Sequence, residues 1–118
     1  MRYMFLIYNN EKAREDASPE EIKRNMAGHI VLMDEANRRG IFKGADPLQP
    51  TSAATTVRTN NGKVTITDGP FAETKEQLAG YYILDCKDLD EALEWAAKMP
   101  TGFSSGMSCV EVRPIREL

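Results

Sequence analysis

The sequence predicts an α+β domain in which two helices cover one face of an antiparallel sheet. Three observations favour this class. Residues 2–8 and 78–84 are almost continuously apolar, two further segments carry helix-capping signals, and an Asn-Gly pair joins two segments of alternating polarity. The chain has 118 residues, the usual size of one domain, so we treat residues 1–118 as a single unit.

Composition and charge argue against several classes of protein. Apolar residues make up 42% and charged residues 28% of the chain, as in an ordinary globular domain. The formal net charge of −3 supplies no basic surface, so we expect no direct contact with nucleic acid. No apolar run reaches the ~18 residues of a membrane span, and the first residues lack a signal-peptide cleavage pattern. We therefore expect a cytoplasmic protein without a membrane segment.

The potential metal ligands are few. Cys86 and Cys109 belong to no C-x-x-C motif, and His29 is the only histidine. This pattern indicates neither a disulfide framework nor a zinc site. We expect both cysteines to be buried thiols. No metal site is indicated, and the sequence leaves the cofactor unknown.

The first strand and the first helix are predicted from residues 2–40. Residues 2–8 are apolar at almost every position, which is typical of a central strand covered on both faces. Ser18 and Pro19 begin a helix, and Gly40 ends it. Spacings of three and four residues predict one apolar helix face, formed by Ile22, Met26, His29, Ile30 and Met33.

The middle of the chain predicts a hairpin. Residues 41–54 contain Gly44, Pro47 and Pro50, and apart from a short piece at residues 41–42 we expect an irregular connection. In the following segment, TTVRTNNGKVTIT, Asn61-Gly62 predicts a two-residue type I′ turn. The resulting register pairs Val57 with Ile66, Thr59 with Val64, and Arg58 with Thr65.

The last third predicts strand, helix and strand. Residues 78–84 form a second doubly apolar strand. Asp88 caps a shorter helix that ends before Pro100. The apolar face of this helix contains Leu89, Ala92, Leu93, Ala96 and Ala97, and we expect Trp95 to contribute to packing as well. Residues 108–113 form the final strand, and Pro114 favours an edge position.

This order of elements matches the ferredoxin-like βαββαβ fold, with the Asn-Gly hairpin as an insertion. Two helices cover only one face of such a sheet, whereas residues 2–8 and 78–84 are apolar on both faces. The uncovered face therefore requires an apolar partner, and we expect this to be the same face of a second copy. The predicted assembly is a homodimer through the open sheet face.

The corner Asp68-Gly69-Pro70-Phe71 has two interpretations. In the first it is a turn, with Phe71 packed into the core and the following charged residues in solvent. In the second, Asp68 is held at the end of the sheet, with Glu73 and Lys75 beside it at a pocket for acid–base chemistry.

Five segments carry a resemblance to a known family. VTITDGPFAETKEQLAGYYI closely resembles the signature of the DGPF group of YCII-related proteins, and MRYMFLIY, GADPLQPTSAATTVR, DLDEALEWAAKMP and VEVRPI extend the resemblance over nearly the whole chain. The resemblance implies a bacterial protein with a ferredoxin-like, dimeric α/β-barrel fold. It also implies an active site with a histidine on the first helix and a nearby aspartate, which handles small organic molecules. Some related proteins are associated with sigma factors of the extracytoplasmic type.

His29 resembles the family histidine, and it also allows a structural interpretation as a packed core residue. Our first hypothesis is an enzyme acting on a small cyclic or aromatic metabolite in the cleft between the first helix and the sheet. His29 is then the base and Asp68 or Asp46 its partner. Arg58 contacts an anion, and the remaining candidate substrate-binding residues are Phe71, Glu73 and Lys75. The alternatives are a non-catalytic ligand-binding or regulatory module that works with a sigma factor, and a corner that is scaffold alone.

Overall fold

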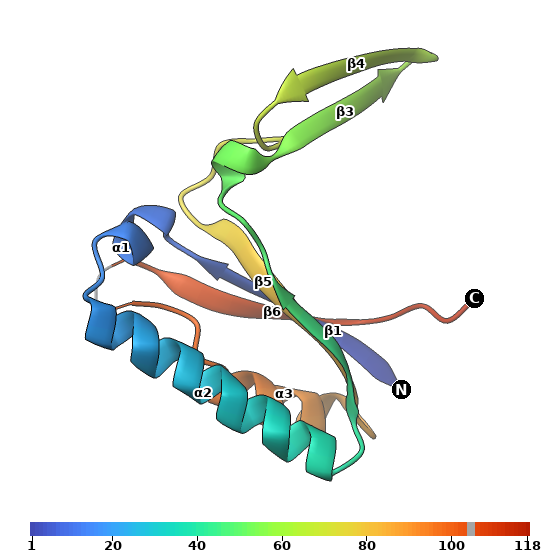
Figure 1. Cartoon of the computed structure of the whole chain (residues 1–118). Helices are drawn as coiled ribbons and strands as arrows, with labels where there is room; N and C mark the ends of the chain where they lie inside the picture. Colours follow the sequence, from blue (N-terminus) through green and yellow to red (C-terminus); the bar gives the residue numbers. More distant parts are fainter. Residues whose placement is uncertain (104–105) are drawn as a thin grey trace.

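The computed structural model describes residues 1–103 and 106–118, and within them the central feature is a four-stranded antiparallel sheet (Figure 1). Its strands are β1 (Arg2–Asn9), β2 (Phe42–Pro47), β5 (Gln77–Asp85) and β6 (Ser108–Pro114). They lie in the order β2-β5-β1-β6, which places β1 and β5 in the centre and leaves Pro114 on an edge strand. With the helices between them, these strands form the expected ferredoxin-like arrangement.

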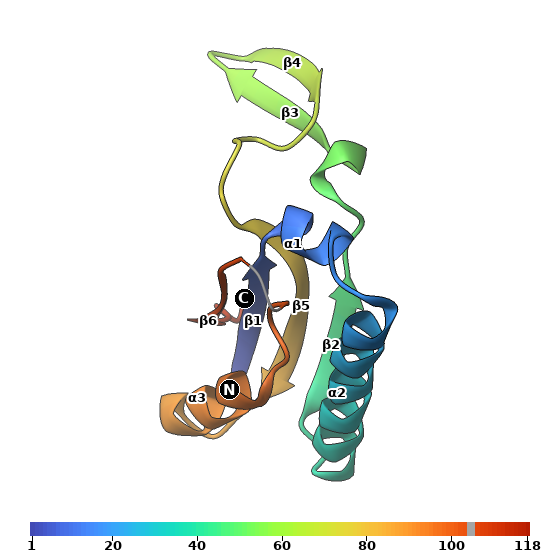
Figure 2. The same ribbon diagram turned by 90° about the vertical axis from the view of Figure 1, so that its left-hand side faces the viewer.

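Two capped helices lie on the same side of the sheet (Figure 2). Helix α2 (Pro19–Arg38) begins where the Ser18 hydroxyl accepts a hydrogen bond from the Glu21 amide at 3.1 Å. Helix α3 (Leu89–Lys98) begins where the Asp88 carboxylate accepts from the Glu91 amide at 2.9 Å. Both starts agree with the sequence analysis, because the capping signals are local.

Two elements differ from the expectation for the connections. Helix α1 (Glu11–Glu15), capped by Asn10, was not expected. Residues 42–47 form strand β2 rather than an irregular connection, with a single 3₁₀ turn η1 (Thr51–Ala53) after it. Pro47 is tolerated because β2 is an edge strand, where a missing backbone donor costs little, and pairing with the apolar strand β5 overrides the glycine and proline signals.

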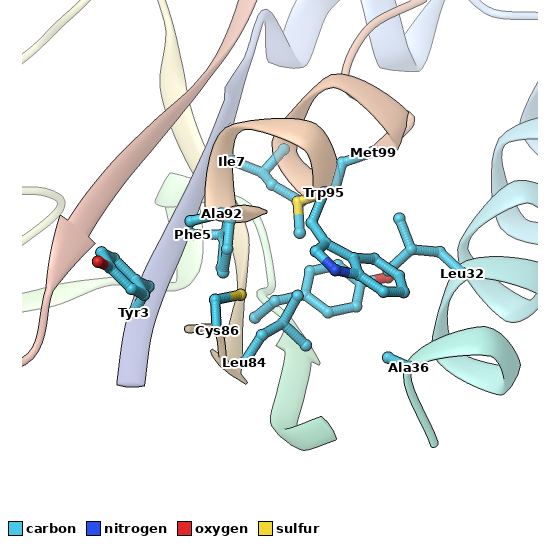
Figure 3. Packing of buried hydrophobic residues seen from close by; sticks show 11 residues of the cluster. Tyr3, Phe5, Ile7, Leu32, Ala36, Leu84, Cys86, Ala92, Trp95 and Met99 are labelled. Carbon is cyan, nitrogen blue, oxygen red and sulfur yellow. The ribbon is translucent and has the colours of Figure 1, made fainter. Parts of the chain in front are cut away.

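The core lies between the sheet and the two helices (Figure 3). Phe5 and Leu84, on adjacent strands, have no solvent exposure, and Trp95 from α3 packs against them in the same cluster. The members of this core are Tyr3, Phe5, Ile7, Leu32, Ala36, Tyr82, Leu84, Cys86, Ala92, Trp95 and Met99.

The predicted apolar faces of the helices are only partly buried. In α2 the buried residues are Leu32 and Ala36, whereas Met26 and Ile30 are exposed, because this helix packs on the core through its C-terminal half. In α3, Leu89 and Leu93 are half-exposed while Ala92 and Trp95 are buried.

The inserted hairpin, formed by β3 (Thr55–Asn60) and β4 (Lys63–Asp68), projects away from the sheet (Figure 1), and we call it the arm. Its register pairs Val57 with Ile66 and Arg58 with Thr65, as predicted. Asn61 and Gly62 have φ angles of 51° and 79°, as a type I′ turn requires. The apolar side chains of the arm, Val57, Val64 and Ile66, are exposed.

The sheet face opposite the helices carries no element of the described chain. Along β1, buried residues alternate with the partly exposed Met4, Leu6 and Tyr8, and Tyr81 and Ile83 of β5 are also partly exposed. Cys86 is buried in the core as expected, but Cys109 is exposed on edge strand β6, so the expectation of two buried thiols was wrong for Cys109. No helix in residues 1–103 and 106–118 has the length and apolarity to cross a membrane.

Candidate functional site

A cavity of about 530 Å³ lies between helix α2 and the sheet. Two small residues of paired strands, Ala45 of β2 and Gly80 of β5, lie in its floor. A side chain at Gly80 would meet the Asp46 carbonyl oxygen at 2.8 Å, so this position requires glycine where β2 and β5 pair. The residues that α2 contributes to the lining are Ile22, Asn25, Met26, His29, Ile30 and Met33.

This lining explains why the apolar face of α2 is exposed. Met26 and Ile30 were predicted to be core residues, and they border the cavity instead. The cavity therefore occupies the cleft that the sequence analysis expected between the first helix and the sheet. Its size is within the usual range for sites that bind small organic molecules.

A histidine–tyrosine pair forms the central polar contact of the cavity. His29 Nδ1 lies 2.7 Å from the Tyr82 hydroxyl oxygen, and the two rings stack with centroids 5.8 Å apart and planes 19° apart. Both residues line the cavity. Tyr82 is only 3% exposed, whereas His29 is partly exposed, so His29 is the more accessible member of the pair.

Burial sets the protonation of this pair. Burial lowers the pKa of His29 below its ordinary value of 6.5, while a backbone hydrogen bond with Pro100 opposes the shift. Burial also raises the pKa of Tyr82 to about 12. At neutral pH the imidazole is therefore neutral and the phenol keeps its proton. The Tyr82 hydroxyl can donate to Nδ1 or accept from it, so it supports either tautomer of the neutral ring.

Close packing between α2 and the loop after α3 positions His29. A methyl group at Gly28 would come within 2.7 Å of Pro100 Cγ, so glycine allows this loop to reach the helix beside His29. On the other side of the loop, Asn9 Nδ2 donates to the Thr101 carbonyl oxygen at 3.2 Å. The loop wall of the cavity is thus held by both β1 and α2.

Asp46, one of the two proposed partners of His29, lines the same cavity. Its carboxylate accepts a hydrogen bond of 2.7 Å from the Tyr81 hydroxyl, which faces the open side of the sheet. Among the contacts of the described residues, the partner of His29 is the Tyr82 phenol and no carboxylate takes that place. The sequence analysis did not identify Tyr82 as a site residue, although its position on the helix-covered face of the second apolar strand was a usable signal.

The remaining predicted site residues lie in the arm and in the segment after it, outside the lining of this cavity. Asp68 ends β4, opposite Thr55. Arg58 Nη2 donates to the Phe71 carbonyl oxygen, so the hairpin brings these two candidates together. Glu73 is exposed, and Lys75 lines a shallower groove beside α1.

The Asp-Gly-Pro-Phe corner does not deliver Phe71 to the core. Phe71 is 73% exposed, so the interpretation of this side chain as a core plug was wrong. The physical reason is its location, because residues 68–71 follow the projecting arm and lie away from the face that the helices cover (Figure 1). The corner is anchored locally, where the Thr56 hydroxyl donates to the Gly69 carbonyl oxygen at 2.7 Å.

Helix α1 connects the cavity to the base of the arm. The Glu11 carboxylate accepts from the Thr51 amide at 3.1 Å and from the Thr51 hydroxyl at 2.6 Å. Where the chain returns from the arm to the sheet, the Glu11 amide donates to the Oε1 atom of Gln77, the first residue of β5, at 2.9 Å. In the same region, Asn10 Nδ2 donates to the Lys75 carbonyl oxygen at 3.3 Å. Glu11 also lines the cavity, as do Arg14 and Glu15 of the same helix.

The described residues contain no group of three or more His, Cys, Asp or Glu side chains that could hold a metal ion. The chemistry available within the cavity is therefore that of a neutral imidazole, a protonated phenol and scattered carboxylates and amides. This set is suited to hydrogen bonding and to proton transfer.

Comparison with known proteins places these features in a family context. The sequence model of the YCII-related domain matches residues 1–118. An uncharacterized protein of Rhizobium meliloti (strain 1021) is 41% identical over 115 residues, which cover 98% of this chain and 92% of that protein. The similarity therefore extends across the sheet, the helices and the arm.

Proposed function

The chain belongs to the family of YCII-related proteins, and from that premise we propose that it binds a small cyclic or aromatic metabolite in the cavity beneath α2 and acts on it with His29 as an acid–base group. The observation that carries this proposal is the His29–Tyr82 pair inside a largely apolar cavity. Residues 68–71 further support assignment to the DGPF group within this family.

In the proposed mechanism, His29 takes a proton from the ligand. When Nδ1 carries the hydrogen and donates it to the Tyr82 oxygen, Nε2 can accept this proton, and the Pro100 carbonyl oxygen that hydrogen-bonds to the ring favours the protonated form that results. Tyr82 is buried behind the ring, so it acts as a positioning residue that holds the imidazole and supports the tautomer change. It thereby takes the place that the sequence analysis gave to Asp46 or Asp68.

We further propose that the working form is a homodimer through the open sheet face. The partly exposed apolar side chains of β1 and β5, among them Met4, Leu6 and Ile83, support this assembly, because a second copy would remove them from water. The mass in solution tests it. A monomer at micromolar concentration would contradict the proposal.

A regulatory module is the second candidate function. The observation in its favour is the arm, whose apolar side chains are exposed and therefore available to another protein. In this version the cavity binds a signal rather than a substrate, and the arm contacts a partner such as a sigma factor. The family context is the source of that particular partner.

A thermal-shift screen of wild type, His29→Ala and Tyr82→Phe against phenols, lactones and organic acids tests the first function. Tyr3→Phe is the matched control, because it removes a phenol from the same helix-covered face outside the cavity. We expect a ligand that stabilises wild type and Tyr3→Phe but stabilises His29→Ala less. A ligand that stabilises all four proteins equally would place the binding site elsewhere.

A turnover assay with the ligand found in this way separates the two candidate functions. A reaction that His29→Ala abolishes supports the enzyme. Binding without turnover, combined with stoichiometric capture of a protein partner that an Ile66→Asp arm variant loses, would favour the regulatory module.

A further inference from the structure

The charges around the cavity indicate which ligands it accepts. Glu11 and Glu15 of α1 line it together with a single guanidinium, that of Arg14, among the described residues, whereas the carboxylate of Asp46 is bonded to Tyr81 on the open side of the sheet. Arg14 lies on the same helical turn as Glu11 and next to Glu15, so its positive charge has two negative charges close by. The lining is therefore net negative.

Within the part of the chain that the structure describes, the lining of the cavity provides no second cation. The burial that surrounds His29 keeps its ring neutral at neutral pH, so an anionic ligand finds no imidazolium there. Arg58, which the sequence analysis assigned as the anion contact, lies in the arm and donates to the Phe71 carbonyl oxygen. An anion inside the cavity would lose its hydration and meet an acidic rim, which disfavours binding.

A cationic ligand is disfavoured for a different reason. Glu11 is already engaged by the Thr51 amide and hydroxyl, and Asp46 by the Tyr81 hydroxyl. Beside the deeper His29–Tyr82 pair, the α2 side chains that line the cavity are apolar except for the uncharged Asn25, so this helix offers a buried positive charge no carboxylate partner there.

We infer that the ligand is an uncharged ring compound that carries a hydroxyl or carbonyl group for the His29–Tyr82 pair, and that the carboxylates around the cavity select against the corresponding acids. This inference rests on the proposed function, since it concerns the same cavity. It goes further by excluding the organic acids and amines that share the same ring.

Matched pairs of compounds test this selection at pH 7.5. We would titrate wild type with salicylamide against salicylate, and with dihydrocoumarin against 3-(2-hydroxyphenyl)propanoate, its ring-opened acid. Benzyl alcohol and benzylamine form the cationic comparison. We expect the uncharged member of each pair to bind at least tenfold more tightly.

Two variants then separate the charge from the shape of the ligand. Glu11→Gln combined with Glu15→Gln removes two negative charges and keeps the side-chain sizes, and the glutamine at position 11 can still accept from Thr51. In this double variant, we expect the acids to gain at least tenfold in affinity while the uncharged compounds change by less than threefold. His29→Ala reports whether each ligand occupies the cavity.

The outcomes are distinct. If an acid or the amine binds wild type as tightly as its uncharged partner, and His29→Ala weakens that binding, the inference is overturned and the proposed site stands. An unchanged preference in the double variant also overturns it, because the carboxylates then do not select. If no compound binds, or if His29→Ala binds all of them as well as wild type, the proposed function fails and this inference fails with it.

Discussion

The arm and the sheet it leaves are built from similar sequence patterns but have opposite burial. Both contain alternating or continuous apolar residues in antiparallel strands. Phe5 in the sheet is 0% exposed, whereas Ile66 in the arm is 69% exposed. This difference shows that strand pairing follows from local sequence pattern and turn chemistry, whereas the burial of a strand depends on what packs against it.

The two regions also differ in what supports them. The sheet has helices on one face and the core cluster beneath them (Figure 3). The arm is a two-stranded hairpin, and such hairpins are marginally stable alone in water. It is fastened at its base through η1 on one side, and through Lys75 and the first residue of β5 on the other. We expect substitutions in the sheet and the arm to have very different costs.

The largest expected effect contrasts Phe5→Ala with Ile66→Ala. Phe5→Ala empties a fully buried position and should lower the free energy of unfolding by about 3–5 kcal/mol. Ile66→Ala removes an exposed side chain and should change it by about 0.5 kcal/mol or less. Denaturant unfolding measures both. A cost for Ile66→Ala near that of Phe5→Ala would show that the arm is covered in solution.

The next effect is a pH dependence of folding stability that comes from the body of the protein, by which we mean the four-stranded sheet with helices α2 and α3, and not from the arm. The folded-state pKa of His29 is lowered from 6.5, so below that pH the unfolded chain binds a proton that the folded chain resists. The stability contributed by a neutral His29 is therefore present above pH 6.5 and is lost as the pH falls from 6.5 toward the lowered value. His29→Asn should flatten this part of the stability profile.

NMR titration of the imidazole measures the same shift directly. His29 is the only histidine, so its ring signal needs no assignment among several. A midpoint at or above 6.5 would contradict the predicted environment. The arm variant Ile66→Ala should leave that midpoint unchanged, because the arm does not line the cavity.

A smaller effect is expected at Gly28. Alanine normally stabilises a helix interior by about 1 kcal/mol relative to glycine, but here its methyl group would clash with Pro100. We expect Gly28→Ala to be neutral or destabilising in wild type, and stabilising when Pro100→Ala is also present. A double-mutant cycle of unfolding free energies measures this coupling. Additive values would mean that the loop does not press on α2.

The smallest effect on global stability is expected for the turn of the arm. Gly62 has a φ of 79°, so Gly62→Ala strains the turn by about 1 kcal/mol. Because the hairpin projects from the body, that strain should increase amide exchange in β3 and β4 and leave the melting temperature almost unchanged. A fall of several degrees would show that the arm unfolds together with the body.

Local signals predicted much of the fold. Ser18, Asp88 and Asn61-Gly62 each specify a structure through hydrogen bonds or φ angles within a few residues, and all three act as predicted. Strand β2 was missed because its glycine and proline signals are overridden by pairing with β5. Short helix α1 was missed because five residues give too little periodicity to detect.

The candidate site was harder to predict, since it depends on contacts between distant residues. His29 was identified, but its partner Tyr82 is 53 positions away, and only the tertiary fold brings the two side chains together. Asp68 and Arg58 were chosen for their chemistry, whereas their position relative to the cavity depends on the direction in which the arm leaves the sheet. Sequence pattern specifies the pairing within the hairpin and leaves that direction open.

The shared attachment at α1 makes the arm and the cavity mechanically dependent on one another. Glu11 contacts Thr51 in η1, which leads into the arm, and Gln77 at the start of β5, where the chain returns from the arm. Glu11 also borders the cavity. A shift of η1 or of the start of β5 that moves Glu11 therefore changes the shape of the cavity wall. By thermodynamic reciprocity, a ligand that prefers one wall position must also bias the angle at which the arm is held.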